Sequence, residues 1–229
     1  MDPIELIKTA PELQKIVTTI VAGVPIAEIA KAVVLPSADA LGKRIASRVE
    51  RLFEKTGKIM LDSQSSVQPV SDKLLTDIVR GASVEDDERL HTMWAALLAN
   101  AASPENADKV RPGFIAILKQ MSPDEAALLN WIHDRLSSTE HVSLPLDELY
   151  AVLGHGTEPT ESVERRLTVC LGGLEAAAFL SDMSILPNEP CSFTFKSDTP
   201  NVFSHRTPFL FTHRAVAFVQ ACRPPKPED

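Results

Sequence analysis

The sequence predicts a mainly helical protein with a short β-hairpin near its C-terminus. Alanine and leucine are abundant, and aromatic residues make up only 5% of the 229 residues, which favours helix over sheet. Apolar residues recur at spacings of three and four through most of the chain, as they do on the buried face of a helix. Alternating apolar and polar residues, which indicate strands, occur only in short runs close to the C-terminus.

The composition shifts along the chain divide it into three expected parts. These are an N-terminal helical region at 1–61, a central helical region at 62–121 and a C-terminal module at 122–229. The net charge of −8 is uneven, because residues 1–121 are nearly neutral while residues 122–229 hold 8 basic and 15 acidic side chains. A protein that mainly neutralises phosphates would carry the opposite balance.

The N-terminal region contains a basic amphipathic helix. Ser37 is a candidate cap for a helix that runs to about Lys58, and the polar stretch 62–68 is expected to be a loop. The cations on one side of this helix are Lys43, Arg44, Arg48, Arg51 and Lys55. Three interpretations stay open: the solvated face of a core helix, a surface for an acidic partner that includes the acidic tail of a second copy, or a membrane-surface or nucleic-acid contact by residues 38–58.

The central region predicts two helices before a further short one. The first begins after Ser71 and ends near Gly81. We expect Ser83 to cap the second, whose first turn would carry the carboxylates of 85–88 at the positive end of the helix dipole. The stretch from Asn100 to Pro104 is expected to end it. Its apolar positions form one stripe and are Leu90, Met93, Trp94, Leu97 and Leu98.

The C-terminal module begins with a strong helix start, in which Ser122 and Glu125 have the spacing of a capping box. A later helix, from Glu161 to about Phe179, contains Gly172-Gly173, which we attribute to close packing against a neighbouring helix. The alternating runs 191–196 and 209–211 are expected to pair as a hairpin. Helices followed by a hairpin are the order of a winged helix.

The sequence shows no recognisable catalytic centre, and no cofactor or metal site is expected. Asp86, Asp87, Glu88 and His91 resemble an acidic cluster, but the start of a helix explains them without chemistry. Cys170, Cys191 and Cys222 have neither zinc nor redox spacing and are expected to be free thiols in a reducing cytoplasm. No segment has the length and apolarity of a membrane span or a signal peptide.

The segment from Val70 to Ile132 resembles the abortive infection alpha family of bacterial proteins. The similarity is most specific from Glu85 to Asn100, and it continues through Pro112 and Phe114 to the run from Leu118 to Ala126. Upstream Leu35-Pro36 and Leu41-Gly42-Lys43 and downstream Phe211 to Cys222 are also similar to the family. The resemblance implies a role in resisting bacteriophage, and it transfers no catalytic residues.

These observations together predict a non-enzymatic protein of phage defence that acts by binding a protein partner or by self-association. The candidate interaction surface comprises the five cations of the basic helix and two arginines of the later helix, namely Lys43, Arg44, Arg48, Arg51, Lys55, Arg165 and Arg166. The alternative is a winged-helix transcriptional regulator that reads DNA with Arg165 and Arg166, which the acidic C-terminal module disfavours. A toxin enzyme such as a nuclease is the third hypothesis.

Overall fold

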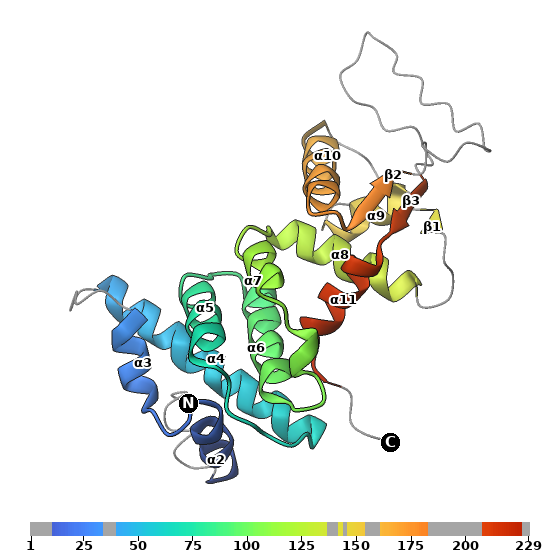
Figure 1. Cartoon of the computed structure of the whole chain (residues 1–229). Helices are drawn as coiled ribbons and strands as arrows, with labels where there is room; N and C mark the ends of the chain where they lie inside the picture. The colour runs from blue at the N-terminus through green and yellow to red at the C-terminus, as the bar shows by residue number, and fades with distance from the viewer. Residues whose placement is uncertain are drawn as a thin grey trace. The chain divides into compact units, whose positions relative to one another are not determined.

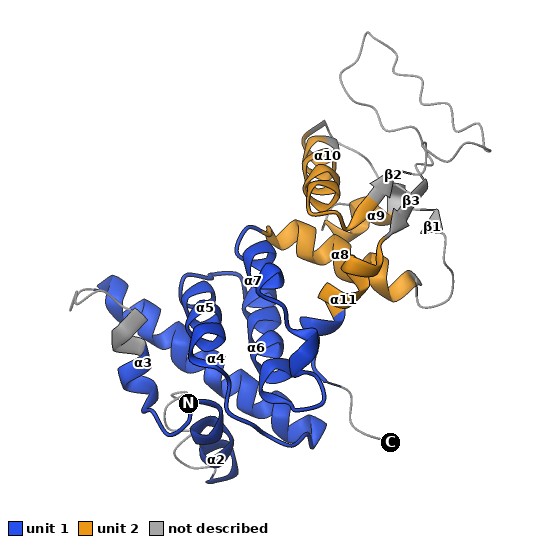
Figure 2. Ribbon diagram, viewed as in Figure 1, with its two compact units in different colours: residues 1–120, 220–229 blue, residues 121–219 orange. Residues whose placement is uncertain are grey.

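The structure is a computed structural model of the whole chain (Figure 1). It describes residues 11–33, 40–136, 142–143, 146–153, 161–182 and 208–225. Helices dominate these residues, so the predicted mainly helical class is confirmed. The chain divides into two compact units, one of residues 1–120 with 220–229 and one of residues 121–219 (Figure 2).

Unit 1 is built from helices only in the part of it that is described. They are α2 (Pro11–Ile20), α3 (Ile26–Val33), α4 (Ala40–Ser63), α5 (Asp72–Ser83), α6 (Glu88–Ala102), the 3-10 helix η1 (Ala107–Lys109) and α7 (Pro112–Leu118). The long helix α4 packs against α2, α3, α5 and α6. It continues past the expected end at Lys58 to Ser63, and Gln64 ends it with a left-handed φ of 55°.

Helix α6 forms the centre of unit 1. The expected apolar stripe is buried, and Trp94 is 0% exposed. Burial extends well beyond that stripe, because every residue from Met93 to Ala102 is buried. The single-stripe prediction was therefore too narrow, and the reason lies in the alanines at 95, 96, 99, 101 and 102, which let neighbouring segments approach α6 from all sides.

The start of α6 differs from the prediction. Ser83 is the last residue of α5, and its hydroxyl donates to the carbonyl of Arg80. The cap of α6 is Asp87, whose carboxylate accepts hydrogen bonds from the backbone N–H groups of Arg89 and Leu90. A carboxylate is the stronger acceptor at a helix N-terminus, so the helix begins four residues later than expected.

Helix α6 ends within the stretch 100–104, as the sequence predicted, although Asn100 is not its last residue. Asn100 lies inside the helix, 3% exposed, and its side-chain amide donates to the carbonyls of Ala221 and Arg223 at 2.9 and 2.7 Å. Helix α6 ends two residues later, at Ala102, with Ser103 as its C-cap. The asparagine thus satisfies carbonyls at the C-terminal end of the chain that no helix turn would satisfy.

Unit 2 combines helices with a small sheet. Its elements are α8 (Pro123–Leu136), β1 (Val142–Ser143), α9 (Leu146–Val152), α10 (Glu161–Ala176), β2 (Leu180–Asp182), β3 (Pro208–Phe211) and α11 (His213–Ala221), whose last two residues count with unit 1. The capping box of α8 is confirmed, because the Glu125 carboxylate accepts from the Ser122 N–H at 2.6 Å while the Ser122 hydroxyl accepts from the Glu125 N–H at 3.2 Å.

The predicted hairpin was wrong in its partner strand. The sheet has the order β1-β3-β2 with antiparallel pairs, so β3 lies in the middle. Phe209 pairs with Val142 on one edge and with Asp182 on the other, which leaves no free edge there for the run 191–196. That run, and residues 197–207 after it, lie outside the described residues. Alternation predicts an extended segment but not which distant segment it joins.

The three expected parts and the two compact units divide the chain differently. Unit 2 begins at residue 121, next to the expected boundary between 121 and 122. The expected boundary between residues 61 and 62 falls inside α4, where a continuous helix packs on both sides of it. Among the described residues no helix combines the length and the apolar character needed to cross a membrane.

Candidate interaction surfaces

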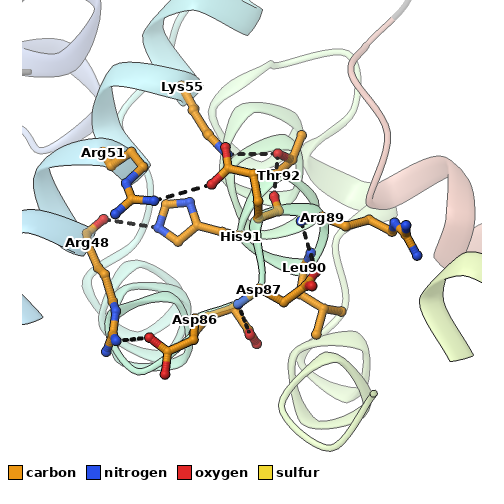
Figure 3. Close-up of polar contacts among 11 residues, drawn as sticks. Arg48, Arg51, Lys55, Asp86, Asp87, Arg89, Leu90, His91 and Thr92 are labelled. Carbon is orange, nitrogen blue, oxygen red and sulfur yellow. Dashed lines mark hydrogen bonds and ion pairs between the residues drawn. The ribbon is translucent and has the colours of Figure 1, made fainter. Parts of the chain in front are cut away.

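The basic helix of the sequence is α4, and three of its cations lie along the side that faces the start of α6. Arg48, Arg51 and Lys55 follow one another at spacings of three and four, so they line one face of the helix. Figure 3 shows them reaching toward the α5–α6 connection and the first turn of α6. Helices α4 and α6 are packed against each other along their length, which brings these opposite charges together.

Arg48 is the most enclosed of these cations. Its side chain is 13% exposed, and it forms an ion pair with Asp86 (Figure 3). The guanidinium also donates to the carbonyl of Ser83 at 3.3 Å, the last carbonyl of α5. Arg48 therefore connects α4 to the end of α5 and to the connection before α6, where a helix end leaves a carbonyl without an internal partner.

Arg51 and Lys55 share one acidic partner, Glu88, in the first turn of α6. The Lys55 ammonium lies 2.6 Å from one carboxylate oxygen and the Arg51 guanidinium 3.2 Å from the other. Lys55 also donates to the hydroxyl of Thr92 at 2.8 Å. The hydrogen bond from Lys55 is the main reason that the pKa of Glu88 is lowered. These two cations are thus paired with an acidic residue of the same unit, while the Arg51 side chain stays 42% exposed.

His91 lies beneath these ion pairs and is 1% exposed. Its Nε2 is 3.1 Å from the carbonyl oxygen of Arg48, which can only accept, so Nε2 carries the proton and Nδ1 does not. Nδ1 is buried without a hydrogen-bond partner. Burial, together with the charge of Lys55, lowers the pKa of His91 to about 4. The side chain is a neutral part of the core with no access to a substrate.

The remaining two cations of the predicted surface on α4, Lys43 and Arg44, stand apart from this cluster. Both are exposed, and within the described part of the chain neither makes an ion pair. The five cations predicted to form one surface on α4 therefore fall into two groups. Three of them bind acidic residues of the same chain, and Lys43 and Arg44 remain open to solvent at the N-terminal end of the helix.

The two arginines on α10 also have different surroundings. The Nε and Nη2 atoms of Arg166 donate to the carboxylate of Asp124, at the start of α8, at 3.1 and 2.6 Å. Arg165 is exposed on the outward side of α10. Because Asp124 neutralises Arg166, the pair does not present the two open cations that the sequence suggested.

The apolar part of the exposed face of α10 was not predicted from the sequence, which pointed only to Arg165 and Arg166 on this helix. Its inward face is buried as expected and comprises Val163, Leu167, Cys170, Leu171 and Leu174. On the outward face Val169 is 72% exposed, the most exposed large apolar side chain of the described residues, and Gly172 is exposed one turn later. A helical wheel places both residues on one side of the helix. A single valine in a sequence does not predict an exposed apolar surface.

The buried thiols are chemically inert. Burial raises the pKa of Cys170 to about 11 and that of Cys222 further still. A thiol with a raised pKa is a poor nucleophile and a poor metal ligand. Cys170 and Cys222 are free, as expected, while Cys191 lies outside the described residues. In the part of the chain that is described, no three histidine, cysteine or acidic side chains gather as metal ligands.

The comparison with known families is decisive for classification. The family model described as abortive infection alpha matches residues 41–182, which is more than half of the chain. The chain belongs to the abortive infection alpha family. No curated protein and no solved structure matches it.

The abortive infection alpha match covers both candidate surfaces. It extends from the start of α4 to the end of β2, so it includes the α4–α6 ion pairs and the outward face of α10. The most specific part of the resemblance, Glu85 to Asn100, forms the α5–α6 connection and most of α6. The similarity noted from Phe211 to Cys222 lies beyond the matched residues. Membership of this family links the chain to abortive infection.

Proposed function

We propose that this protein is a non-enzymatic interaction protein of phage defence, which acts by binding a protein partner. Its membership of the abortive infection alpha family carries the proposal for phage defence. In abortive infection an infected bacterium stops growing or dies before it releases phage. A protein that triggers this response by contact needs an exposed surface and a stable scaffold, and it needs no active site.

The placement of the charged residues supports binding without catalysis. Asp87 caps α6, Asp86 and Glu88 pair with cations of α4, and His91 is buried and neutral. Each member of the acidic cluster thus has a structural partner or position. A catalytic acid or base needs access to a substrate and a pKa near the working pH, which the burial of His91 opposes.

If Asp86, Asp87, Glu88 and His91 serve only the fold, no reaction of this protein depends on their side chains. Asp86→Ala removes an exposed carboxylate, 83% of whose side chain is open to solvent, so the fold should tolerate the change. If the protein acts by contact, the variant protects cells against phage as the wild type does, measured by phage plating at equal protein levels. Loss of protection by a folded Asp86→Ala variant would contradict the proposal and favour a toxin enzyme.

The candidate contact surfaces are the exposed end of α4 and the outward face of α10. Lys43 and Arg44 offer two solvated cations to an acidic partner. Val169 offers an apolar contact with Arg165 beside it. Arginine side chains are enriched where proteins meet.

The second candidate function is DNA binding by a winged helix. This candidate starts from the order helix, strand, helix, helix, strand, strand in unit 2, and α10 is the helix that would enter the major groove. The acidic composition of residues 122–229 and the pairing of Arg166 with Asp124 oppose binding to phosphates. Salt-sensitive retention on DNA that Arg165→Ala removes would favour this candidate over protein binding.

A phage challenge in liquid culture tests the proposed function. Cells with and without the intact gene are infected at low and at high phage-to-cell ratio, and culture density is followed. We expect protection at low ratio and collapse at high ratio, because infected cells die without spreading phage. Equal lysis with and without the gene at both ratios, for a diverse set of phages, would contradict the proposal.

A further inference from the structure

The N-terminal end of α4 continues a row of side chains that the fold uses only in part. Arg48, Arg51 and Lys55 of this row are paired with acidic residues near the start of α6. Leu41 and Arg44 lie on the same face of the helix, because they precede Arg48 by seven and by four residues. Both are exposed, and the described residues include no ion-pair partner for Arg44. The row therefore extends about 10 Å beyond Arg48.

The end of α5 adds an exposed apolar side chain beside this row. Val84 is 66% exposed, and it follows Ser83, whose carbonyl accepts a hydrogen bond from Arg48. Leu41 is 55% exposed, so Val84 and Leu41 are the two most exposed large apolar side chains among the described residues of unit 1. We refer to Leu41, Arg44 and Val84 as the open surface of unit 1.

The acidic residues closest to the open surface are already engaged. Asp86 and Glu88 neutralise the three paired cations of the row. The carboxylate of Glu85 accepts a hydrogen bond from the backbone N–H of Asp87 at 2.9 Å. Within the described part of the chain, Arg44 is thus the cation of the row that receives no carboxylate.

We propose that the open surface binds an acidic segment of a partner protein. A carboxylate of that segment pairs with Arg44, and its apolar side chains pack on Leu41 and Val84. The contacts of Arg48 show how the row binds such a segment, because its guanidinium holds a carboxylate and a backbone carbonyl of one stretch of chain. A guanidinium offers several N–H donors in one plane and suits both acceptors. The partner continues this series by one helix turn.

The surrounding charges favour a protein segment over a lipid surface or a nucleic acid. The side chains of Asp86 and Glu88, next to the open surface, are 83% and 67% exposed. Membranes and nucleic acids carry phosphates over their whole extent, so they would bring phosphates against these two carboxylates, which repel them. A protein segment needs a carboxylate only opposite Arg44 and presents uncharged residues elsewhere.

This inference names the kind of partner in the proposed function, and in that respect it rests on that function. The two can fail separately, because binding to the purified chain is measured without phage. Binding of acidic peptides through Arg44 in a chain that gives no protection would leave the open surface standing and remove the defence role. Full protection by an Arg44→Glu variant would remove the open surface and leave the defence role standing.

Selection of random peptides on the purified full-length chain tests the open surface. We expect the enriched peptides to combine acidic with apolar residues and to bind more weakly as salt is added. Arg44→Glu, Leu41→Glu and Val84→Glu should each raise the dissociation constant of the strongest peptide about tenfold or more. All three side chains are exposed, so the melting temperature should stay close to that of the wild type.

Two matched controls lie away from the open surface. Leu61→Glu changes an exposed leucine in the last turn of the same helix. Lys15→Glu changes an exposed cation of α2, which contacts α4 through Leu13 at Gly57, more than three turns from the open surface. Neither change should alter the dissociation constant of the peptide.

A charge exchange identifies the pair that Arg44 makes. Each acidic residue of the strongest peptide is replaced by lysine in turn. One replacement should weaken binding to the wild type and restore binding to the Arg44→Glu variant at least partly, because the pair is then reversed. Failure of every replacement to restore binding would contradict a direct pair with Arg44.

Three other outcomes overturn the proposal. The first is a selection that enriches no peptides, or peptides without acidic residues. The second is a strongest peptide that binds the Arg44→Glu and Leu41→Glu variants as it binds the wild type. The third is retention of the chain on anionic lipid vesicles or on duplex DNA that Arg44→Glu removes, which would assign the open surface to phosphates.

Discussion

At the scale of single residues, the contact between Trp94 and Gly81 holds the centre of unit 1 together. The indole of Trp94 is fully buried and lies directly over the Cα of Gly81 in α5, so a methyl group there would overlap the ring. Gly81→Ala should therefore lower the free energy of unfolding by about 1–3 kcal/mol, although alanine favours helix. Urea titration checks this, with Gly113→Ala as a control because that site has open space. Equal stability of the two variants would contradict the packing.

His91 gives unit 1 a pH-dependent stability. The pKa of His91 is about 4 in the folded protein against 6.5 for an ordinary histidine, so the unfolded chain takes up a proton first as the pH falls. The contribution is complete above pH 6.5 and is lost toward pH 4, amounting to up to about 3 kcal/mol. His91→Gln keeps a donor near the Arg48 carbonyl and should flatten this part of the profile. A wild-type profile with the same slope as the variant would refute the account.

At the scale of elements, the α4–α6 contact depends on Arg48 more than on its neighbours. Arg48→Met should cost about 1 kcal/mol or more, because the Ser83 carbonyl loses a donor in a partly buried place. The Asp86 pair adds little, since that carboxylate is largely solvated. Lys43→Met on the same helix is the control and should change stability by less than about 0.5 kcal/mol. If both variants lost a similar amount of stability, the contacts of Arg48 would not be what stabilises the α4–α6 packing.

The helix starts show what local sequence specifies. The capping box of Ser122 and Glu125 was predicted correctly, because both partners lie within four residues of each other. For α6 only Ser83 was expected as the cap, whereas Asp87 is the cap, and Arg48 from another helix binds the Asp86 side chain and the Ser83 carbonyl just before it. Local pattern therefore locates a helix well but does not fix its first residue.

Distant pairing also limited the prediction of the sheet and of the candidate surfaces. β3 was located correctly, but its neighbours, β1 and β2, come from segments that no alternation marked. The basic face of α4 was recognised, but its neutralisation by Glu88 depends on a contact across 37 positions of the chain. On the outward face of α10 the sequence pointed to Arg165 but not to Val169, because one exposed valine leaves no pattern.

At the scale of the whole molecule, the composition predicted the fold class, and one long motif predicted the family. The mainly helical class follows from residue propensities summed over the chain, which average out local errors. The family resemblance rests on many positions at once, and the match to residues 41–182 confirms it. Neither source specifies a partner, because a binding surface needs only a few exposed side chains on a scaffold.

The central claim is that this protein stops phage release from infected cells. The most direct measurement counts infective centres, the fraction of infected cells that yield at least one phage, together with the survival of the same cells. The account predicts far fewer infective centres when the gene is present, with no gain in the number of surviving cells. An unchanged fraction of infective centres, or cells that survive infection and divide, would contradict it.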